Sequence, residues 1–326
     1  MRKSLIAVLA VMALTLTGCS VGDSYDSLPQ PCGTLSDNAA AAKIQSTGAF
    51  DTKPNITFPM PLHSKTLAAH TLIKGSGPKF FGDQMIKFDY TALNAANGKV
   101  YSSSKYDGTD PVFQSFTKDT QIEVCKALTG ASEGSRVAIL IPAAIAHKNQ
   151  GDASAGIGAN DDIILTIDLI KVYYPRAIGQ INPLPGGLGN IIRTVSGQPS
   201  WQQATGSAPK SLVLFNSITS ANEQTVAKGD TVTLQYIGFN WATGTTFDSS
   251  WTSGPVQMKL DSSNQLIKGF VSALLNGRDG KPTHVGDEIT AVIPPSLGYG
   301  SEIKSGIPAN STLVFIIDIL GTEKAK

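Results

Sequence analysis

One acidic residue set among aromatic side chains is the most distinctive candidate for chemistry in this chain of 326 residues. Asp248 follows Phe247 directly, and Tyr236 precedes both in the same segment. The sequence has no G-x-S-x-G nucleophile elbow, and its glycine-rich loops lack the strand and helix that flank a dinucleotide site. The histidines have no metal-binding spacing such as H-E-x-x-H; they are His63, His70, His147 and His284. We therefore expect no metal and no cofactor.

The segment that carries Asp248 has the pattern of a β-hairpin. Thr231–Tyr236 alternates β-branched, apolar and aromatic residues with polar ones, which is typical of a strand. Ala242–Gly244 supplies a turn, and Thr245–Phe247 returns to extended structure. The hairpin would therefore place the aspartate just after its second strand begins.

An internal repeat organises the rest of the chain. Tyr90–Asn94 aligns with Tyr236–Asn240 at an offset of 146 residues, and the paired serines Ser103 and Ser104 align with Ser249 and Ser250. Later segments align as well, namely Ala138–Pro142 with Thr290–Pro294 and Ile163–Asp168 with Leu313–Asp318. Two copies of one domain explain the length better than one large core.

The second copy resembles the FK506-binding-protein family of peptidyl-prolyl cis-trans isomerases. Six blocks occur in the family's order over roughly 209–323: Gln235–Gly238, Thr246–Ser250, Leu266–Phe270, Ile293–Gly300, Gly306–Pro308 and Thr312–Phe315. The resemblance implies an α+β fold of two tandem domains. Each would be a twisted antiparallel sheet wrapped around one short helix, which is Gln265–Leu275 in the second copy.

The resemblance also implies a proline-binding pocket in the second copy. Its catalytic residues would be Tyr236, Phe247, Asp248, Ile267, Phe270, Tyr299 and Phe315. Further pocket walls would come from Val256, Met258, Leu266 and Ile307. Phe270 stands where the family often has tryptophan, and Val256 replaces a usual aromatic residue. By the same resemblance, the pocket would bind X-Pro segments of exported polypeptides and, as an inhibitor, a macrolide.

Such residues suit the rotation of an X–Pro peptide bond, which faces a barrier of about 18–20 kcal/mol. Because no covalent bond is broken, neither a nucleophile nor a cofactor is needed. An aromatic cavity excludes water, and a few fixed polar groups favour the twisted amide over the planar one. We expect the Tyr299 hydroxyl and the Ile267 N–H to donate to substrate carbonyls. Asp248 would orient the tyrosines or meet the carbonyl carbon.

The first copy lacks most of this constellation. Tyr90 and Tyr101 keep aromatic character, but Ser102 stands in place of the aspartate. The remaining equivalents also differ: His147 for Tyr299, Leu165 for Phe315, and Ile122 with Glu123 for Gly269 with Phe270. We predict a domain that folds but isomerises weakly or not at all, and that serves to bind clients or as a spacer.

The N-terminus has the pattern of an export signal. Arg2 and Lys3 precede the largely apolar run Leu5–Leu16, which is too short to span a bilayer. Leu16–Cys19 resembles the lipobox of bacterial lipoproteins, so cleavage would leave lipid on Cys19; a plain secretory signal is the alternative. The lipid would hold the protein on the outer, extracytoplasmic face of a bacterial membrane. Cleavage would leave 24 basic and 25 acidic residues, a net charge of −1.

These signals predict five segments along the chain. They are a signal peptide at 1–18, a lipidated flexible tether at 19–62, a degenerate domain at 63–174, a Gly/Pro linker at 175–206 and the isomerase domain at 207–326. The net charge of +1 gives no reason to expect nucleic acid. An exported chain would allow Cys32 and Cys125 to pair, although spacing alone leaves free thiols equally open.

Two function classes remain open from the sequence. The first is an exported, membrane-anchored prolyl isomerase that assists protein folding, with its activity in the C-terminal domain. The second is a non-catalytic lipoprotein chaperone or adaptor that binds exposed peptide segments in the same grooves. Retention of Asp248 and Tyr299 in one copy favours the enzyme.

Overall fold

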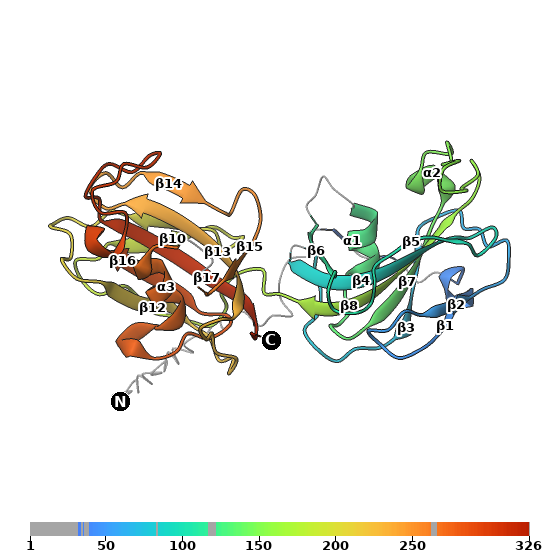
Figure 1. Ribbon diagram of the computed structural model, residues 1–326, viewed down its shortest axis with the longest axis horizontal. Coiled ribbons are helices and arrows are strands. Elements are labelled where there is room, and N and C mark those ends of the chain that lie inside the picture. Colours follow the sequence, from blue (N-terminus) through green and yellow to red (C-terminus); the bar gives the residue numbers. More distant parts are fainter. Residues whose placement is uncertain are drawn as a thin grey trace, which may run out of the picture.

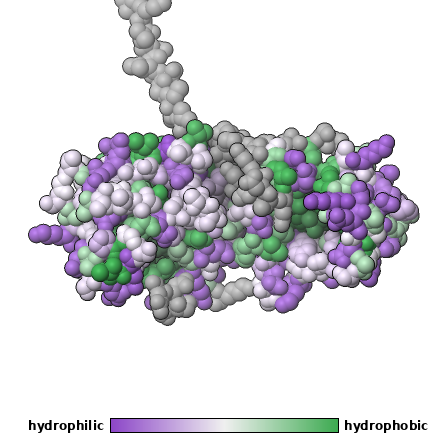
Figure 2. Space-filling view, turned by 90° about the horizontal axis from the view of Figure 1, so that it is seen from above, coloured by the Kyte–Doolittle hydropathy of each residue, from purple (hydrophilic) through white to green (hydrophobic). Residues whose placement is uncertain are grey.

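The computed structural model describes residues 32–33, 35, 39–82, 84–116, 122–261 and 266–325. The predicted signal peptide and Cys19 lie outside these residues. Two domains lie side by side along the long axis, with the first in blue to green and the second in yellow to red (Figure 1). On the face shown in Figure 2, polar and apolar side chains are interspersed over both domains. No helix in the described part of the chain is long and apolar enough to cross a membrane.

The first domain is a six-stranded antiparallel sheet with a short helix against it. Its strands follow the order β3-β7-β8-β4-β5, and β6 also pairs with β4. The elements are β3 (Ala68–Ile73), β4 (Met85–Asn94), β5 (Val100–Ser103), β6 (Val112–Ser115), α1 (Ile122–Leu128), β7 (Arg136–Ile141), α2 (Ala143–Ala146) and β8 (Ile163–Val172). This architecture agrees with the α+β class expected from the sequence.

The second domain repeats this architecture and adds one strand. Its order is β14-β13-β17-β16-β12-β9, with β15 also paired to β13. The elements are β9 (Gln180–Ile181), β12 (Val213–Thr219), β13 (Thr231–Asn240), β14 (Thr246–Ser249), β15 (Val256–Lys259), α3 (Lys268–Leu275), η3 (Arg278–Gly280), β16 (Glu288–Ile293), η4 (Pro295–Leu297) and β17 (Leu313–Glu323).

The strand register confirms the internal repeat residue by residue. Gly238 lies opposite Phe315 between β13 and β17, and Ala92 lies opposite Leu165 between β4 and β8. The second serine of each pair closes its hairpin in the same way. The Ser250 Oγ accepts from the Tyr236 N–H at 2.9 Å, and Ser104 does the same for Tyr90.

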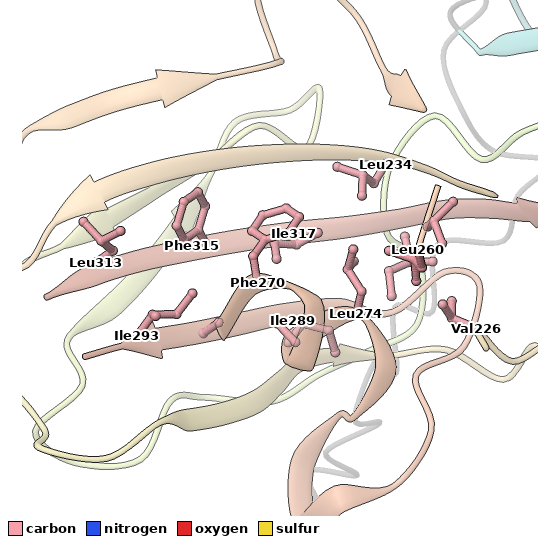
Figure 3. Close-up of a cluster of buried hydrophobic side chains, with 14 of the residues drawn as sticks. Val226, Leu234, Leu260, Phe270, Leu274, Ile289, Ile293, Leu313, Phe315 and Ile317 are labelled. Carbon is pink, nitrogen blue, oxygen red and sulfur yellow. The ribbon is translucent and has the colours of Figure 1, made fainter. Parts of the chain in front are cut away.

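The helix of the second domain covers one face of its sheet and forms the main core with it. Gly269, Phe270, Ala273 and Leu274 form one buried stripe on α3. Figure 3 shows Phe270 and Leu274 directed at the strands β16 and β17. A Cβ at Gly269 would lie 2.4 Å from the Ile293 Cγ2, so the missing side chain allows the helix to approach the sheet. This close approach sets the depth of the space at the N-terminal end of α3.

The predicted flexible tether is wrong for residues 39–62, which fold onto the first domain. They form η2 (Ala41–Lys43), β1 (Gln45–Thr47) and β2 (Asn55–Thr57), and β1 pairs with β2. Ile44 and Leu62 are buried in one cluster with Leu140 of β7 and Ile164 of β8. The prolines in this segment are typical of an unstructured tether. They exclude long elements, but they leave room for strands of three residues.

A buried ion pair ties this hairpin to the sheet. Arg136 on β7 donates to both carboxylate oxygens of Asp168 on β8, at 2.6 and 2.7 Å, and both side chains are fully buried. The same guanidinium donates to the carbonyls of Gly48, Ala49 and Thr52 in the loop between β1 and β2, at 3.3, 3.1 and 2.8 Å. The loop therefore supplies the hydrogen bonds that a buried arginine requires.

The predicted Gly/Pro linker is also wrong, because residues 177–204 pack on the second domain. β9 joins the sheet, and β10 (Asn190–Arg193) pairs with β11 (Pro199–Gln202). Trp201 is buried against Phe239 and Trp241. Arg193 forms an ion pair with Glu288, which is fully buried. The glycines and prolines here make the turns of short strands rather than an unstructured connection.

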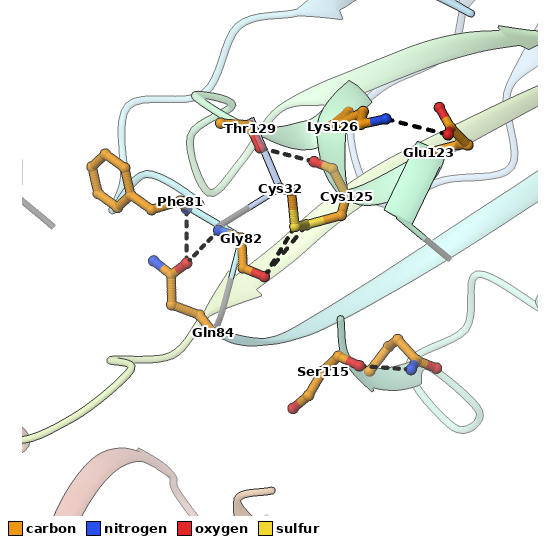
Figure 4. The surroundings of a disulfide bond; sticks show 10 residues. Cys32, Phe81, Gly82, Gln84, Ser115, Glu123, Cys125, Lys126 and Thr129 are labelled. Atoms are coloured by element: carbon orange, nitrogen blue, oxygen red, sulfur yellow. Dashed lines mark hydrogen bonds and ion pairs between the residues drawn. A yellow bond between two sulfur atoms is a disulfide. The ribbon is translucent and has the colours of Figure 1, made fainter. Parts of the chain in front are cut away.

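Cys32 and Cys125 form a disulfide bond, which settles the pairing that the spacing left open. The bond links the start of the described chain to α1, across 93 residues (Figure 4). Both sulfur atoms lie within 3.4 Å of the Gly82 carbonyl oxygen. In the chain-entropy account, closing a loop of this length destabilises the unfolded state by about 4–5 kcal/mol.

The two domains touch through the end of β17. Tyr173 donates to the Glu323 carboxylate at 2.6 Å, and Lys87 pairs with the same carboxylate at 3.0 Å. The Lys171 ammonium donates to the Thr322 carbonyl at 2.8 Å. The Tyr173 ring also covers Gly321, where a Cβ would lie 2.5 Å from the ring. These contacts join the last strand of the second domain to β4 and β8 of the first.

We predict that Arg136→Met destabilises the first domain by about 3–5 kcal/mol, because it leaves the buried Asp168 carboxylate without its positive partner and with only the Asp51 N–H as a hydrogen-bond donor. The double variant Arg136→Met/Asp168→Leu removes both charges and should recover most of this loss. Native-state hydrogen exchange of the β7 and β8 amides measures the effect in the full chain. A single variant as stable as the double variant would contradict this account of the pair.

Candidate proline-binding site

A cavity of about 160 Å³ opens between the N-terminal end of α3 and the sheet of the second domain. It is lined by Tyr236, Phe247, Asp248, Met258, Leu266, Ile267, Phe270, Tyr299 and Phe315. All seven residues predicted as catalytic are thus brought together around one space. An apolar cavity of about 150 Å³ can hold benzene, so this one has room for a pyrrolidine ring.

Two of the predicted wall residues do not line the cavity. Val256 packs against the core from β15, and Ile307 is buried within that core with 5% of its surface exposed. Met258 and Leu266 do line the cavity, as expected. Strand alternation placed Val256 and Met258 on the same face of β15. It could not show that only the second reaches the open space.

The aromatic rings form a continuous apolar wall. Phe315 on β17 is the centre: its ring centroid lies 5.5 Å from that of Phe247 and 5.1 Å from that of Phe270, both edge-to-face. Tyr236 lies 5.9 Å from Phe270 with the rings at 81°. Edge-to-face pairs at these distances are favourable beyond the area they bury. The four rings therefore hold one another in place without closing the cavity.

Gly238 makes this arrangement possible, and sequence reasoning noted it only as part of a motif. It lies on β13 directly beneath two of the rings. A Cβ at this position would lie 2.5 Å from the Phe247 Cζ and 3.0 Å from the Phe315 Cε1. Real side chains essentially never approach so closely, so any larger residue would displace the rings.

A short hydrogen bond fixes the acidic residue of the site. The Tyr236 hydroxyl donates to Asp248 Oδ2 at 2.6 Å, and the Ser249 N–H donates to Asp248 Oδ1 at 2.9 Å. Burial raises the pKa of Tyr236, and the hydrogen bond and negative charge of Asp248 raise it further. The tyrosine therefore stays protonated at neutral pH and keeps the carboxylate oriented.

Two hydrogen-bond donors at the cavity have no partner within the described residues. One is the Tyr299 hydroxyl, and the other is the backbone N–H of Ile267. Ile267 is extended, with φ −64° and ψ 144°, and it immediately precedes the first residue of α3. Its N–H lies before the helical hydrogen bonds begin. Both donors are thus available to the carbonyl groups of a bound peptide.

The first domain has the hairpin of this site without its cavity walls. Tyr90 keeps a hydrogen bond across the hairpin, but its partner is the Ser102 hydroxyl at 2.9 Å. Ala92 occupies the position of Gly238, and Leu165 that of Phe315. Glu123, aligned with the floor phenylalanine, pairs instead with Lys126 at 3.3 Å. At the positions that match Asp248 and Phe315, the first domain therefore has a serine and a leucine.

His147, the counterpart of Tyr299, is held by backbone groups. Its Nε2 lies 2.8 Å from the Asp161 carbonyl oxygen, and its Nδ1 accepts from the Gly151 N–H at 3.0 Å. Both ring nitrogens are therefore occupied within the domain. Across the described residues, no group of three or more His, Cys, Asp or Glu side chains is placed to hold a metal ion.

We predict that Gly238→Ala weakens binding of a proline-containing peptide at least ten-fold, because the added methyl displaces the Phe247 and Phe315 rings. Isothermal titration of the full chain measures the affinity, and circular dichroism checks that the fold is retained. Ala92→Gly, the matched change in the first domain, should leave the affinity unaltered. Equal affinities for Gly238→Ala and the wild type would show that the ring positions do not matter.

Comparisons with known proteins find relatives for part of the chain. Over 97 residues the chain is 40% identical to FK506-binding protein 4 of Chaetomium thermophilum, covering 30% of this chain and 18% of the fungal protein. Over 114 residues it is 33% identical to the FKBP-type peptidyl-prolyl cis-trans isomerase FkpA of Escherichia coli K12, covering 35% and 38%. The aligned part is therefore less than half the length of either relative.

A solved structure and a family match complete the comparison. The three FKBP domains of wheat FKBP73 align with 79% of this chain and 95% of that chain, at 18% identity and a TM-score of 0.34. The family described as FKBP-type peptidyl-prolyl cis-trans isomerase matches residues 79–170 and 222–320, one stretch in each domain and together more than half of the chain. On that match, the chain belongs to the FKBP-type peptidyl-prolyl cis-trans isomerase family.

Proposed function

We propose that the cavity of the second domain binds the proline of X-Pro segments and catalyses rotation about the preceding peptide bond. The observation that carries this proposal is the combination of four packed rings with two unpaired donors at one cavity. Rings alone would fit any apolar ligand. The donors beside them suit a peptide, which has carbonyl groups on both sides of its proline ring.

The proposed mechanism uses the difference between the planar and the twisted amide. Twisting removes the conjugation between the nitrogen and the carbonyl group, so the twisted amide has a smaller dipole than the planar one. A dry aromatic cavity withholds the water that stabilises this dipole, and it therefore disfavours the ground state relative to the transition state. The donors on Tyr299 and Ile267 hold the flanking carbonyls so that only the bond of interest rotates. Asp248 orients Tyr236 in the wall.

The first domain is proposed to bind clients or to act as a spacer, without appreciable catalysis. This rests on the serine in place of Asp248, on the occupied nitrogens of His147 and on the loss of rings around Leu165. Its contact with β17 would hold it against the catalytic domain. A non-catalytic chaperone remains the second candidate for the protein as a whole, supported by the two-domain arrangement.

We further propose export and attachment to the outer face of a bacterial membrane through lipid on Cys19, with exported polypeptides as clients. The lipobox-like Leu16–Cys19 supports this, and so does the disulfide between Cys32 and Cys125. Because Cys32 is bonded to the first domain, residues 20–31 alone would link the lipid to the folded part. At about 3.4 Å per residue, they span roughly 40 Å at most.

We expect Asp248→Asn and Tyr299→Phe each to lower kcat/KM for isomerisation of an X-Pro peptide about ten-fold, which corresponds to about 1.4 kcal/mol of transition-state stabilisation. A protease-free assay on the full chain measures this. Ser102→Ala, at the matching position of the first domain, is the control and should leave the rate unchanged.

The same variants separate the two candidate functions. If the full chain does not accelerate isomerisation but suppresses aggregation of an unfolded protein, the chaperone is favoured. If Ser102→Ala lowers the rate while Asp248→Asn does not, the assignment to the second domain is wrong.

The proposed lipid anchor predicts that the protein made in a bacterial host incorporates a labelled fatty acid and sediments with membranes. Cys19→Ser should abolish both, because the thiol that carries the lipid is lost. Cys32→Ser is the matched control and should retain label and sedimentation. Label in the Cys19→Ser variant would rule out this cysteine as the attachment point.

A further inference from the structure

A second and larger groove adjoins the proline cavity. It encloses about 530 Å³ and shares Leu266, Ile267 and Tyr299 with that cavity. Its other walls are the first residue of α3 and the loop after β16, namely Lys268, Pro295, Ser296, Leu297, Gly298, Gly300, Glu302 and Lys304. The rotation mechanism assigns no role to this space. Its shared wall makes it continuous with the site.

The groove is lined by two lysines, Lys268 and Lys304, and by one acidic residue, Glu302. Lys304 pairs with Glu302 at 2.7 Å, and its ammonium lies 5.7 Å from the centre of the Tyr299 ring. The pair is neutral as a unit. Lys268 is exposed and has no ion pair within the described residues, and the first turn of α3 contains no acidic residue. The groove therefore carries one uncompensated positive charge.

We propose that this groove holds the side chain of a residue next to the substrate proline and that it prefers an acidic one. The inference rests on the proposed function of the proline cavity. Consecutive Cα atoms are 3.8 Å apart, so a residue adjacent to a bound proline lies within reach of the shared wall of Ile267 and Tyr299. A carboxylate there meets Lys268. Lysine at the same place meets an ammonium of like charge.

Asp248 also carries a negative charge, but it lines the proline cavity and not the groove. Its hydrogen bond from the Tyr236 hydroxyl holds the carboxylate in the cavity wall without neutralising it. An exposed ion pair contributes up to about 1 kcal/mol, so the preference for an acidic neighbour should be about two- to five-fold. At 1 M salt the Debye length falls to about 3 Å, and the preference should largely disappear.

The test compares peptides that differ only beside the proline, with Glu, Gln or Lys first before it and then after it. Two quantities are measured on the full chain: kcat/KM for isomerisation, and peptide affinity by fluorescence anisotropy. We expect Glu to exceed Lys about two- to five-fold at low salt, at one of the two positions. The Gln peptide serves as the neutral reference.

Three variants locate the effect. Lys268→Glu should invert the ratio of kcat/KM between the Glu and Lys peptides. Glu302→Gln should increase that ratio, because Lys304 then becomes a second free charge. Lys281→Glu makes the same charge change at an exposed position outside the groove, and it should leave the ratio as in the wild type.

The outcomes distinguish the groove from the proposed catalysis. Equal activity and affinity for the Glu and Lys peptides, with isomerisation intact, would overturn the groove proposal and leave the proposed function standing. A ratio that Lys281→Glu changes as much as Lys268→Glu would overturn it too, because it would reflect net charge alone. Absent isomerisation with a Glu preference in affinity that Lys268→Glu inverts would reject catalysis and support the groove.

Discussion

The aromatic wall of the cavity stands over Gly238, where a side chain would collide with both Phe247 and Phe315. This absence of a Cβ lets two phenylalanine rings from different strands meet edge-to-face above β13. Phe270 then packs on Phe315, and Tyr236 on Phe270. Each ring fixes the next, so the free space stays open in the middle. In the first domain, Ala92 fills the same place, and Leu165 replaces the central ring.

A sheet with two apolar faces must be covered on both, and this chain does so twice. The helix covers one face and borders the cavity in the second domain. A short hairpin covers the other: β1–β2 in the first domain and β10–β11 in the second. An arginine holds each hairpin to its sheet, but from opposite sides. Arg136 is buried in the first sheet and donates to carbonyls of the β1–β2 loop. Arg193 lies on the β10–β11 hairpin, is partly exposed, and pairs with the buried Glu288 of the second sheet. The repeating unit is therefore longer than the matched family domain.

The sequence predicted the parts of the fold that follow from long, regular patterns. The strands around Tyr236 and Tyr90 follow from alternation, and the repeat register follows from the aligned segments. The seven cavity residues came from the resemblance to the FK506-binding-protein family. The β1–β2 and β10–β11 hairpins could not be predicted, because strands of three or four residues between prolines and glycines show too little periodicity. Val256 and Ile307 could not be told from cavity residues, since both alternation and resemblance place them near the pocket. The disulfide needed three-dimensional proximity, which spacing cannot supply.

We propose one working proline pocket in this chain, in the second domain. The most direct measurement is a methyl NMR titration of the full chain with an X-Pro peptide, using labelled isoleucine and leucine. We expect the Ile267 and Leu266 methyl signals to shift, while those of Leu165 in the first domain stay in place. Shifts at Leu165 with none at Ile267 and Leu266 would contradict it.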